Sequence, residues 1–141
     1  RKKVRKIIRI NLEESTRFSP IYDSGCCLAR EKNDDEIQLM NKDIQLIEKY
    51  INKGKSEIHW DEKKVTHFNL VELLLNDYAD IVKNRIKKVK ENFDANNIIS
   101  LVNNIDANLP DFCNEYKLTK ERKEVIIKIV NLRIEKLLSL L

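Results

Sequence analysis

The spacing of hydrophobic positions changes once along this 141-residue chain. Near its start, in the sequence KVRKIIRINL, apolar and polar residues alternate at Ile8, Ile10 and Leu12. Such alternation, with β-branched residues, predicts a strand. The polar sequence EEST follows as a turn, and RFSPI resumes the apolar pattern. We therefore predict a β-hairpin of residues 4–12 and 16–22.

After the hairpin the apolar positions take up the spacing of a helix. They lie three and four residues apart, at Ile37, Met40, Ile44, Ile47 and Ile51. This spacing predicts one helical face. Asn33 or Asp34 can cap the start of the helix, and Gly54 can end it in the left-handed conformation. The next residues, KSEIHWDEKKV, show no regular period, so an irregular stretch is predicted there.

Further helices are predicted in the second half of the chain. Thr66 is suited to cap a long helix, or two helices with a bend, that extends to Val89. Another helix is expected near residues 94–104, and Pro110 interrupts the pattern. Thr119 is suited to cap a terminal helix. Its predicted buried stripe comprises Val125, Ile126, Ile129, Val130, Leu137 and Leu141. The expected fold is mainly α, an N-terminal β-hairpin followed by a helical bundle.

Composition and charge agree with one helix-rich soluble domain. The chain is 42% hydrophobic and 35% charged, with only two glycines and two prolines. Six of its basic residues lie within residues 1–10, and the remainder carries 21 basic against 23 acidic side chains. The basicity therefore belongs to one end of the chain. Direct contact with nucleic acid is not expected, because that needs a basic face with interleaved aromatic residues.

The cysteines and hydropathy indicate a cytoplasmic protein. Cys26, Cys27 and Cys113 have no zinc-ligand spacing, so reduced thiols are expected, with no assigned role. No apolar run approaches the length of a membrane span, and no signal peptide is evident. Because the first residue is Arg1, we expect the chain to be part of a longer protein.

The segment RFSPIYDSG contains the strongest candidate for chemistry, the carboxylate of Asp23. A carboxylate at a strand end, next to a glycine, can act as a hard oxygen ligand for Mg²⁺. Asp-Ser-Gly is also common turn chemistry, in which the aspartate bonds to its own backbone. The residues alone leave both interpretations open.

Three stretches of the chain resemble the HipA-like serine/threonine kinases. RFSPIYDSGCCLARE resembles the magnesium-site segment of that family. GKSEIHWDEKKVTHFNL is similar to a loop and helix start in its helical lobe, and LTKERKEVIIKIVNLRIEKLL is similar to the close of that lobe. The resemblance implies that residues 1–141 are the C-terminal portion of a kinase domain. Residues 1–25 would be the hairpin and magnesium segment, and residues 26–141 the helical lobe.

The resemblance also implies roles for two residues. Asp23 matches the catalytic aspartate that coordinates Mg²⁺ on the ATP phosphates, and Tyr22 matches a residue near the nucleotide pocket. The cofactors implied are ATP and Mg²⁺, and the substrate is a protein phosphorylated on Ser or Thr. Association with a small DNA-binding protein of antitoxin type is common in the family.

Several parts that a kinase needs are absent from this sequence. It has no glycine-rich loop and no catalytic-loop aspartate followed by asparagine, which in this family would precede Arg1. His59 and Asp61 are spaced like a kinase His-x-Asp, but Thr66 stands where that loop needs a metal-binding asparagine. The segment alone is therefore not expected to be active. The alternative function is a non-catalytic interaction module or pseudokinase lobe that binds a protein partner or DNA.

Overall fold

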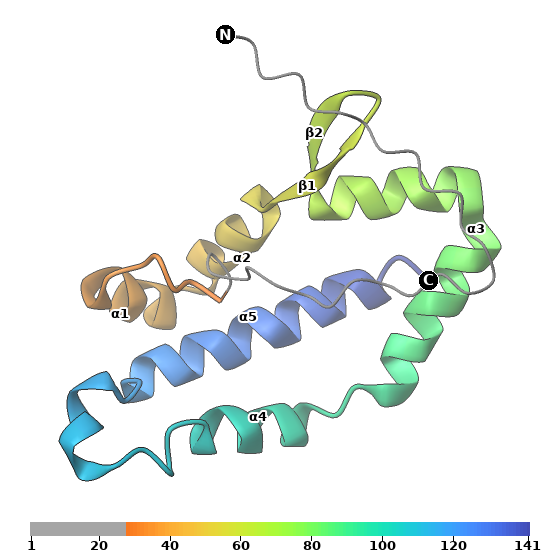
Figure 1. The fold of residues 1–141 in the computed structure, drawn as a ribbon. Helices are drawn as coiled ribbons and strands as arrows, with labels where there is room; N and C mark the ends of the chain where they lie inside the picture. The colour runs from red at the N-terminus through yellow and green to blue at the C-terminus, as the bar shows by residue number, and fades with distance from the viewer. Residues whose placement is uncertain (1–27) are drawn as a thin grey trace, which may run out of the picture.

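The structure, a computed structural model, describes residues 28–141 as a mainly α-helical body that carries one β-hairpin (Figure 1). Along the chain its elements are α1 (Asp34–Lys42), α2 (Ile44–Lys53), β1 (Lys55–Trp60), β2 (Lys63–Thr66), α3 (His67–Asn92), α4 (Ala95–Asn104), the 3₁₀ helix η1 (Asp111–Tyr116) and α5 (Lys120–Leu138). The mainly α fold class is confirmed. The hairpin predicted for residues 4–12 and 16–22 lies outside the described residues.

The helix predicted across residues 34–53 is in fact two helices, so the prediction of one helical face was wrong. Asp43 has extended backbone angles (φ −125°, ψ 105°), and it ends α1 and begins α2. Its side chain accepts a hydrogen bond from the Gln45 backbone amide at 2.9 Å, which is the geometry of an N-cap. The break leaves Ile44 46% exposed.

The stretch predicted to be irregular forms an antiparallel hairpin, so the helical part of the chain contains a β element. β1 pairs with β2 in the register Lys55↔Thr66 and Trp60↔Lys63. Asp61 and Glu62, at the turn, both have positive φ angles, 47° and 64°. Two central residues with positive φ give the tight turn that suits the twist of a hairpin.

The remaining predicted helices are confirmed. Thr66 caps α3, whose one non-helical residue, Tyr78 (φ −138°, ψ 43°), marks a bend. Figure 1 shows that this bend turns the second half of α3 down toward α4, while α5 runs between α4 on one side and α1 and α2 on the other. Thr119 caps α5 and accepts from the Arg122 amide at 3.2 Å. α5 contacts α1, α2, α3 and α4 and is therefore the central helix.

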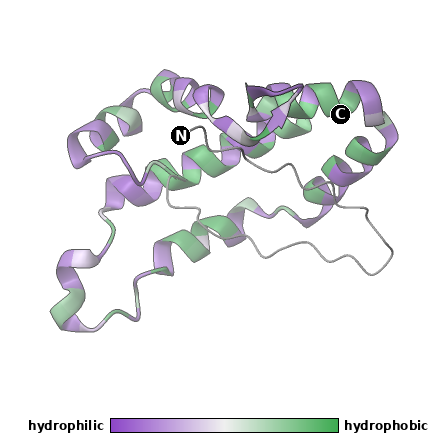
Figure 2. Ribbon diagram, turned by 45° about the horizontal axis from the view of Figure 1, so that its top comes forward, coloured by the Kyte–Doolittle hydropathy of each residue, from purple (hydrophilic) through white to green (hydrophobic). Residues whose placement is uncertain are grey.

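The hydrophobic core lies where α5 meets α1 and α2. Its buried residues are Ala29, Ile37, Met40, Ile47, Ile51, Val125 and Ile129. Figure 2 shows hydrophobic and hydrophilic residues together on the helices, the pattern of helices that pack on one face. The predicted stripe of α5 is fully buried at Val125 and Ile129 but has ended by Leu141, which is 41% exposed.

A nearly buried ion pair joins the turn after α4 to α5. Asp106 is 7% exposed, and its carboxylate lies 2.6 Å from the Lys123 ammonium. The same carboxylate accepts a hydrogen bond from the Leu118 amide at 2.8 Å, and Lys123 also donates to the Asn103 carbonyl at 3.0 Å. The pair therefore fixes the start of α5 against the end of α4.

Because of this ion pair, the free energy of unfolding should decrease at acid pH. The hydrogen bond from Lys123, with that from the Leu118 amide, holds the pKa of Asp106 below its ordinary value of 3.8. The folded protein thus binds fewer protons at this site than the unfolded chain, so the stabilisation is complete above that ordinary value and is lost as pH falls through the lowered pKa. Asp106→Asn should lower the melting temperature by several degrees at pH 7, and the difference should shrink as the pH falls below about 3.8. Thermal unfolding of both proteins across this range checks this, and a difference independent of pH would contradict it.

Candidate functional site

Asp23 and Tyr22, the predicted site residues, lie outside the residues that the structure describes. What the structure does describe is the point at which the chain that follows them enters the helical body. Leu28 and Ala29 form a turn in which both residues have positive φ angles, 57° and 60°. Neither residue is glycine, so this left-handed conformation is strained and persists only where the surroundings enforce it.

The surroundings of this turn come from three parts of the chain. Ala29 is fully buried, and its amide donates a hydrogen bond to the Tyr50 hydroxyl of α2 at 3.0 Å. Its carbonyl accepts from the Lys32 amide at 3.0 Å and from the Arg122 guanidinium of α5 at 3.3 Å. Arg122 also donates to the Lys32 carbonyl and to the Asp34 carboxylate, both at 2.8 Å. The turn is therefore held by both α2 and α5, and we name residues 28–32 the entry turn.

A groove of about 600 Å³ lies beside the entry turn. Its lining comes from the entry turn, α1, α2, the start of β1, the start of α3 and α5, and includes the apolar side chains of Leu39, Met40 and Leu46. Its polar lining includes Glu31, Lys32, Glu36, Lys49, Tyr50, Lys53, Lys55, His67 and Arg133. We call this the α1–α2 groove. A mainly apolar concave surface with a few polar groups is the usual form of a binding site.

The acidic groups of the groove gather near the entry turn. Lys32 and Glu36 form an ion pair at 2.8 Å. Its hydrogen bond raises the pKa of Lys32 and lowers that of Glu36, so both groups are charged at neutral pH. Burial raises the pKa of the Tyr50 phenol, which keeps the hydroxyl protonated. Near the entry turn the groove therefore carries two carboxylates, Glu31 and Glu36, against the one ammonium of Lys32.

The part of the groove around the end of α2 is basic. Lys49 and Lys53 project from α2, Lys55 from β1 and Arg133 from α5. Within residues 28–141 no ion pair or hydrogen bond joins any of these four side chains to another residue. Burial, with the nearby guanidinium of Arg133, lowers the pKa of His67 below its ordinary value of 6.5, so its ring is neutral at pH 7.

Gly54 is needed beside this basic end for a reason other than the one predicted. Its φ and ψ of −57° and 119° are not left-handed, so the predicted left-handed helix end was wrong. A Cβ atom at this position would lie 2.9 Å from Nδ1 of His67, closer than side-chain contacts allow. Gly54 therefore permits the first residue of α3 to approach the end of α2.

The other candidate residues do not assemble into a site. His59 is exposed on β1 and Asp61 is exposed in the hairpin turn. Cys113, in η1, is a half-buried free thiol. Among residues 28–141 no three His, Cys, Asp or Glu side chains are grouped as metal ligands. Cys26 and Cys27 lie outside this range.

The fold and site together define a mainly α body with one hairpin, a fixed entry turn and a groove that is basic at one end. No helix of the described part is long and apolar enough to cross a membrane. No family model, curated protein or solved structure matches the chain.

Proposed function

We propose that this chain is the C-terminal portion of a HipA-like serine/threonine kinase, with Asp23 as a ligand for Mg²⁺ bound to ATP. The proposal starts from the resemblance of RFSPIYDSGCCLARE to the magnesium-site segment of that family. Tyr22 lies next to the nucleotide, and the acceptor is a Ser or Thr hydroxyl of a protein. The enzyme acts in the cytoplasm, where thiols such as Cys113 stay reduced.

The observation that supports this best is the entry turn. Asp23 precedes Leu28 by five residues, so the covalent chain keeps the two within about 18 Å of each other. Positive φ angles at Leu28 and Ala29 cost about 1–3 kcal/mol each, and such strain gathers at functional sites. An anchor held by α2 and α5 gives a ligand-bearing segment a fixed base, as phosphoryl transfer by positioning requires.

The chemistry assigned to this chain is limited to binding and orientation. When bound, Mg²⁺ neutralises charge on the transferred phosphates. Asp23 supplies a carboxylate oxygen of the kind that Mg²⁺ prefers, and the helical lobe holds the segment that carries it. The catalytic-loop groups belong upstream of Arg1 in this family, so the fragment alone should not transfer phosphate.

Binding of nucleotide tests the proposal directly. The protein that includes the catalytic loop should melt at a higher temperature with Mg²⁺ and ATP than without them, because a ligand that binds only the folded state stabilises it. At a ligand concentration 100 times the Kd the gain is about 2.7 kcal/mol. The control is ATP with EDTA, which should shift the melting temperature much less. No shift with Mg²⁺ and ATP would contradict a nucleotide-binding kinase.

A second candidate function is a non-catalytic interaction module or pseudokinase lobe, and the α1–α2 groove favours it. Leu39, which is 59% exposed, and Leu46, which is 36% exposed, line the groove together with Met40, so the groove presents adjoining apolar side chains that a partner would cover. The partner would be a protein, such as a DNA-binding protein of antitoxin type. A catalytic-loop aspartate and asparagine shortly before Arg1 would favour the kinase, and their absence would favour the module.

A further inference from the structure

The α1–α2 groove has an apolar floor that the described residues leave uncovered. Leu39 is 59% exposed and Leu46 is 36% exposed, and both line the groove together with buried Met40. The break at Asp43 creates this arrangement, because it separates α1 from α2 so that the two leucines face the groove from different helices. An open groove with leucines along its floor suits the apolar face of a helix.

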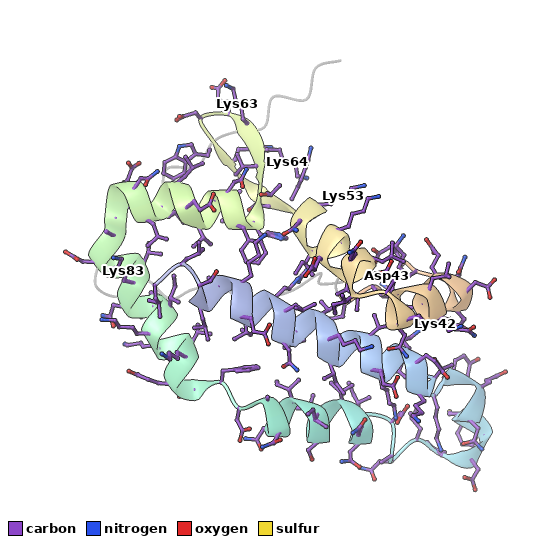
Figure 3. All side chains as sticks on the ribbon, turned by 180° about the vertical axis from the view of Figure 1, so that it is seen from behind. Lys42, Asp43, Lys53, Lys63, Lys64 and Lys83 are labelled. Atoms are coloured by element: carbon purple, nitrogen blue, oxygen red, sulfur yellow. The ribbon has the colours of Figure 1, made fainter. Side chains whose placement is uncertain are left out.

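The charges around this floor restrict what can bind. Lys49 and Lys53 lie one helical turn apart on α2, which places them about 6 Å from each other. Lys55 and Arg133 extend the positive charge beyond the end of α2, and none of the four has an ion-pair partner within residues 28–141. Figure 3 shows Lys53 at the end of α2 next to the hairpin, well apart from Lys83 on α3. Acidic side chains one turn apart on an incoming helix would match this basic end.

We propose that the α1–α2 groove binds an acidic amphipathic helix of a partner protein. Leucine-like residues of that helix cover Leu39 and Leu46, and acidic residues pair with Lys49 and Lys53. A nucleic acid fits less well, because its backbone offers no apolar face for the floor. The proposal does not depend on kinase activity, since no groove residue belongs to the proposed magnesium site.

A labelled peptide tests this with the intact chain. The probe is a fluorescein-labelled amphipathic helix of about 18 residues, with leucines at helical spacing and glutamates beside them. A second peptide carries lysine in place of each glutamate. Fluorescence anisotropy should show binding of the acidic peptide only, and its affinity should fall as salt is raised, because the exposed charges are screened.

Matched variants locate the binding site. Lys49→Gln combined with Lys53→Gln should weaken binding by about tenfold, equivalent to about 1.4 kcal/mol. The control, Lys83→Gln with Lys87→Gln, removes two exposed lysines of the same spacing from α3 and should leave binding unchanged. Leu39→Ser tests the apolar floor independently, with Ile81→Ser, 63% exposed on α3, as its control. Melting temperatures of all variants confirm that they fold.

Several results would overturn the proposal. These are equal binding of both peptides, no binding of either, or binding that survives the groove variants. Equal competition by single-stranded DNA would indicate a general anion site. A dimer in sedimentation experiments that the Leu39→Ser variant disrupts would identify a second copy of the chain as the occupant. Asp23→Asn should leave peptide binding unchanged, which separates this test from that of the kinase.

Discussion

Under the proposed kinase function, Asp23→Asn is expected to abolish phosphoryl transfer by a protein that carries this segment together with a catalytic loop. Asparagine keeps the size of the side chain but removes the negative charge that attracts Mg²⁺. The metal contributes several kcal/mol of charge stabilisation in the transition state, so its loss should lower the rate by about 10³-fold or more. Transfer of radiolabelled phosphate from ATP to protein Ser or Thr measures the effect.

The control for this experiment is Asp61→Asn. Asp61 belongs to the His-x-Asp sequence that mimics a catalytic loop, yet it is exposed in the hairpin turn with a φ angle of 47°. Asparagine tolerates that conformation, so the variant should fold and keep full activity. Activity retained in Asp23→Asn, with an unchanged melting temperature, would show that Asp23 is only a turn residue. Activity lost in Asp61→Asn would instead assign the chemistry to the hairpin.

Most helices of this protein were predictable because they begin at side chains that favour the N-cap position. Asn33, Thr66 and Thr119 each cap a helix, and each accepts a hydrogen bond from an amide in the first turn. The single helix predicted across residues 34–53 was wrong for a local reason. Asp43 can also cap a helix, but it lies within an apolar period that continues from α1 into α2. Periodicity alone does not show whether the chain continues as one helix or breaks at a capping residue.

The hairpin was missed for a different reason. Its turn uses Asp61 and Glu62 at positive φ, where asparagine or glycine would have signalled a turn of this kind. Its register is also irregular between Lys55 and His59, which disrupts the alternation expected of a strand. The local sequence therefore gave little indication of this hairpin, whose structure depends on the pairing of β1 with β2.

The α1–α2 groove could not be predicted, because tertiary packing alone brings its residues together. Tyr50, His67 and Arg133 come from three helices and belong to no motif. The entry turn was equally hidden, since nothing in the sequence Leu28-Ala29 favours a left-handed backbone. The Tyr50 hydroxyl and the Arg122 guanidinium hold this conformation, and both lie far away in the sequence.

Ile129→Ala is expected to be the most damaging single truncation in the core. Ile129 is fully buried at the centre of α5, in the same cluster as residues of α1, of α2 and of the entry turn. Removal of a buried isoleucine side chain costs about 2–5 kcal/mol, from lost apolar burial and from the cavity that remains. This is a large part of the free energy of unfolding of an ordinary domain, which is about 5–15 kcal/mol.

Urea unfolding distinguishes this core effect from a general weakness of the helices. The midpoint for Ile129→Ala should fall while the slope stays the same, as expected when stability changes and the unfolded state does not. The control Ile81→Ala removes the same atoms from a residue of α3 that is 63% exposed, and it should change stability by no more than about 0.5 kcal/mol. Because Ala29 packs in the same cluster as Ile129, the truncation should also loosen the entry turn. Equal effects of the two substitutions would contradict a core centred on α5.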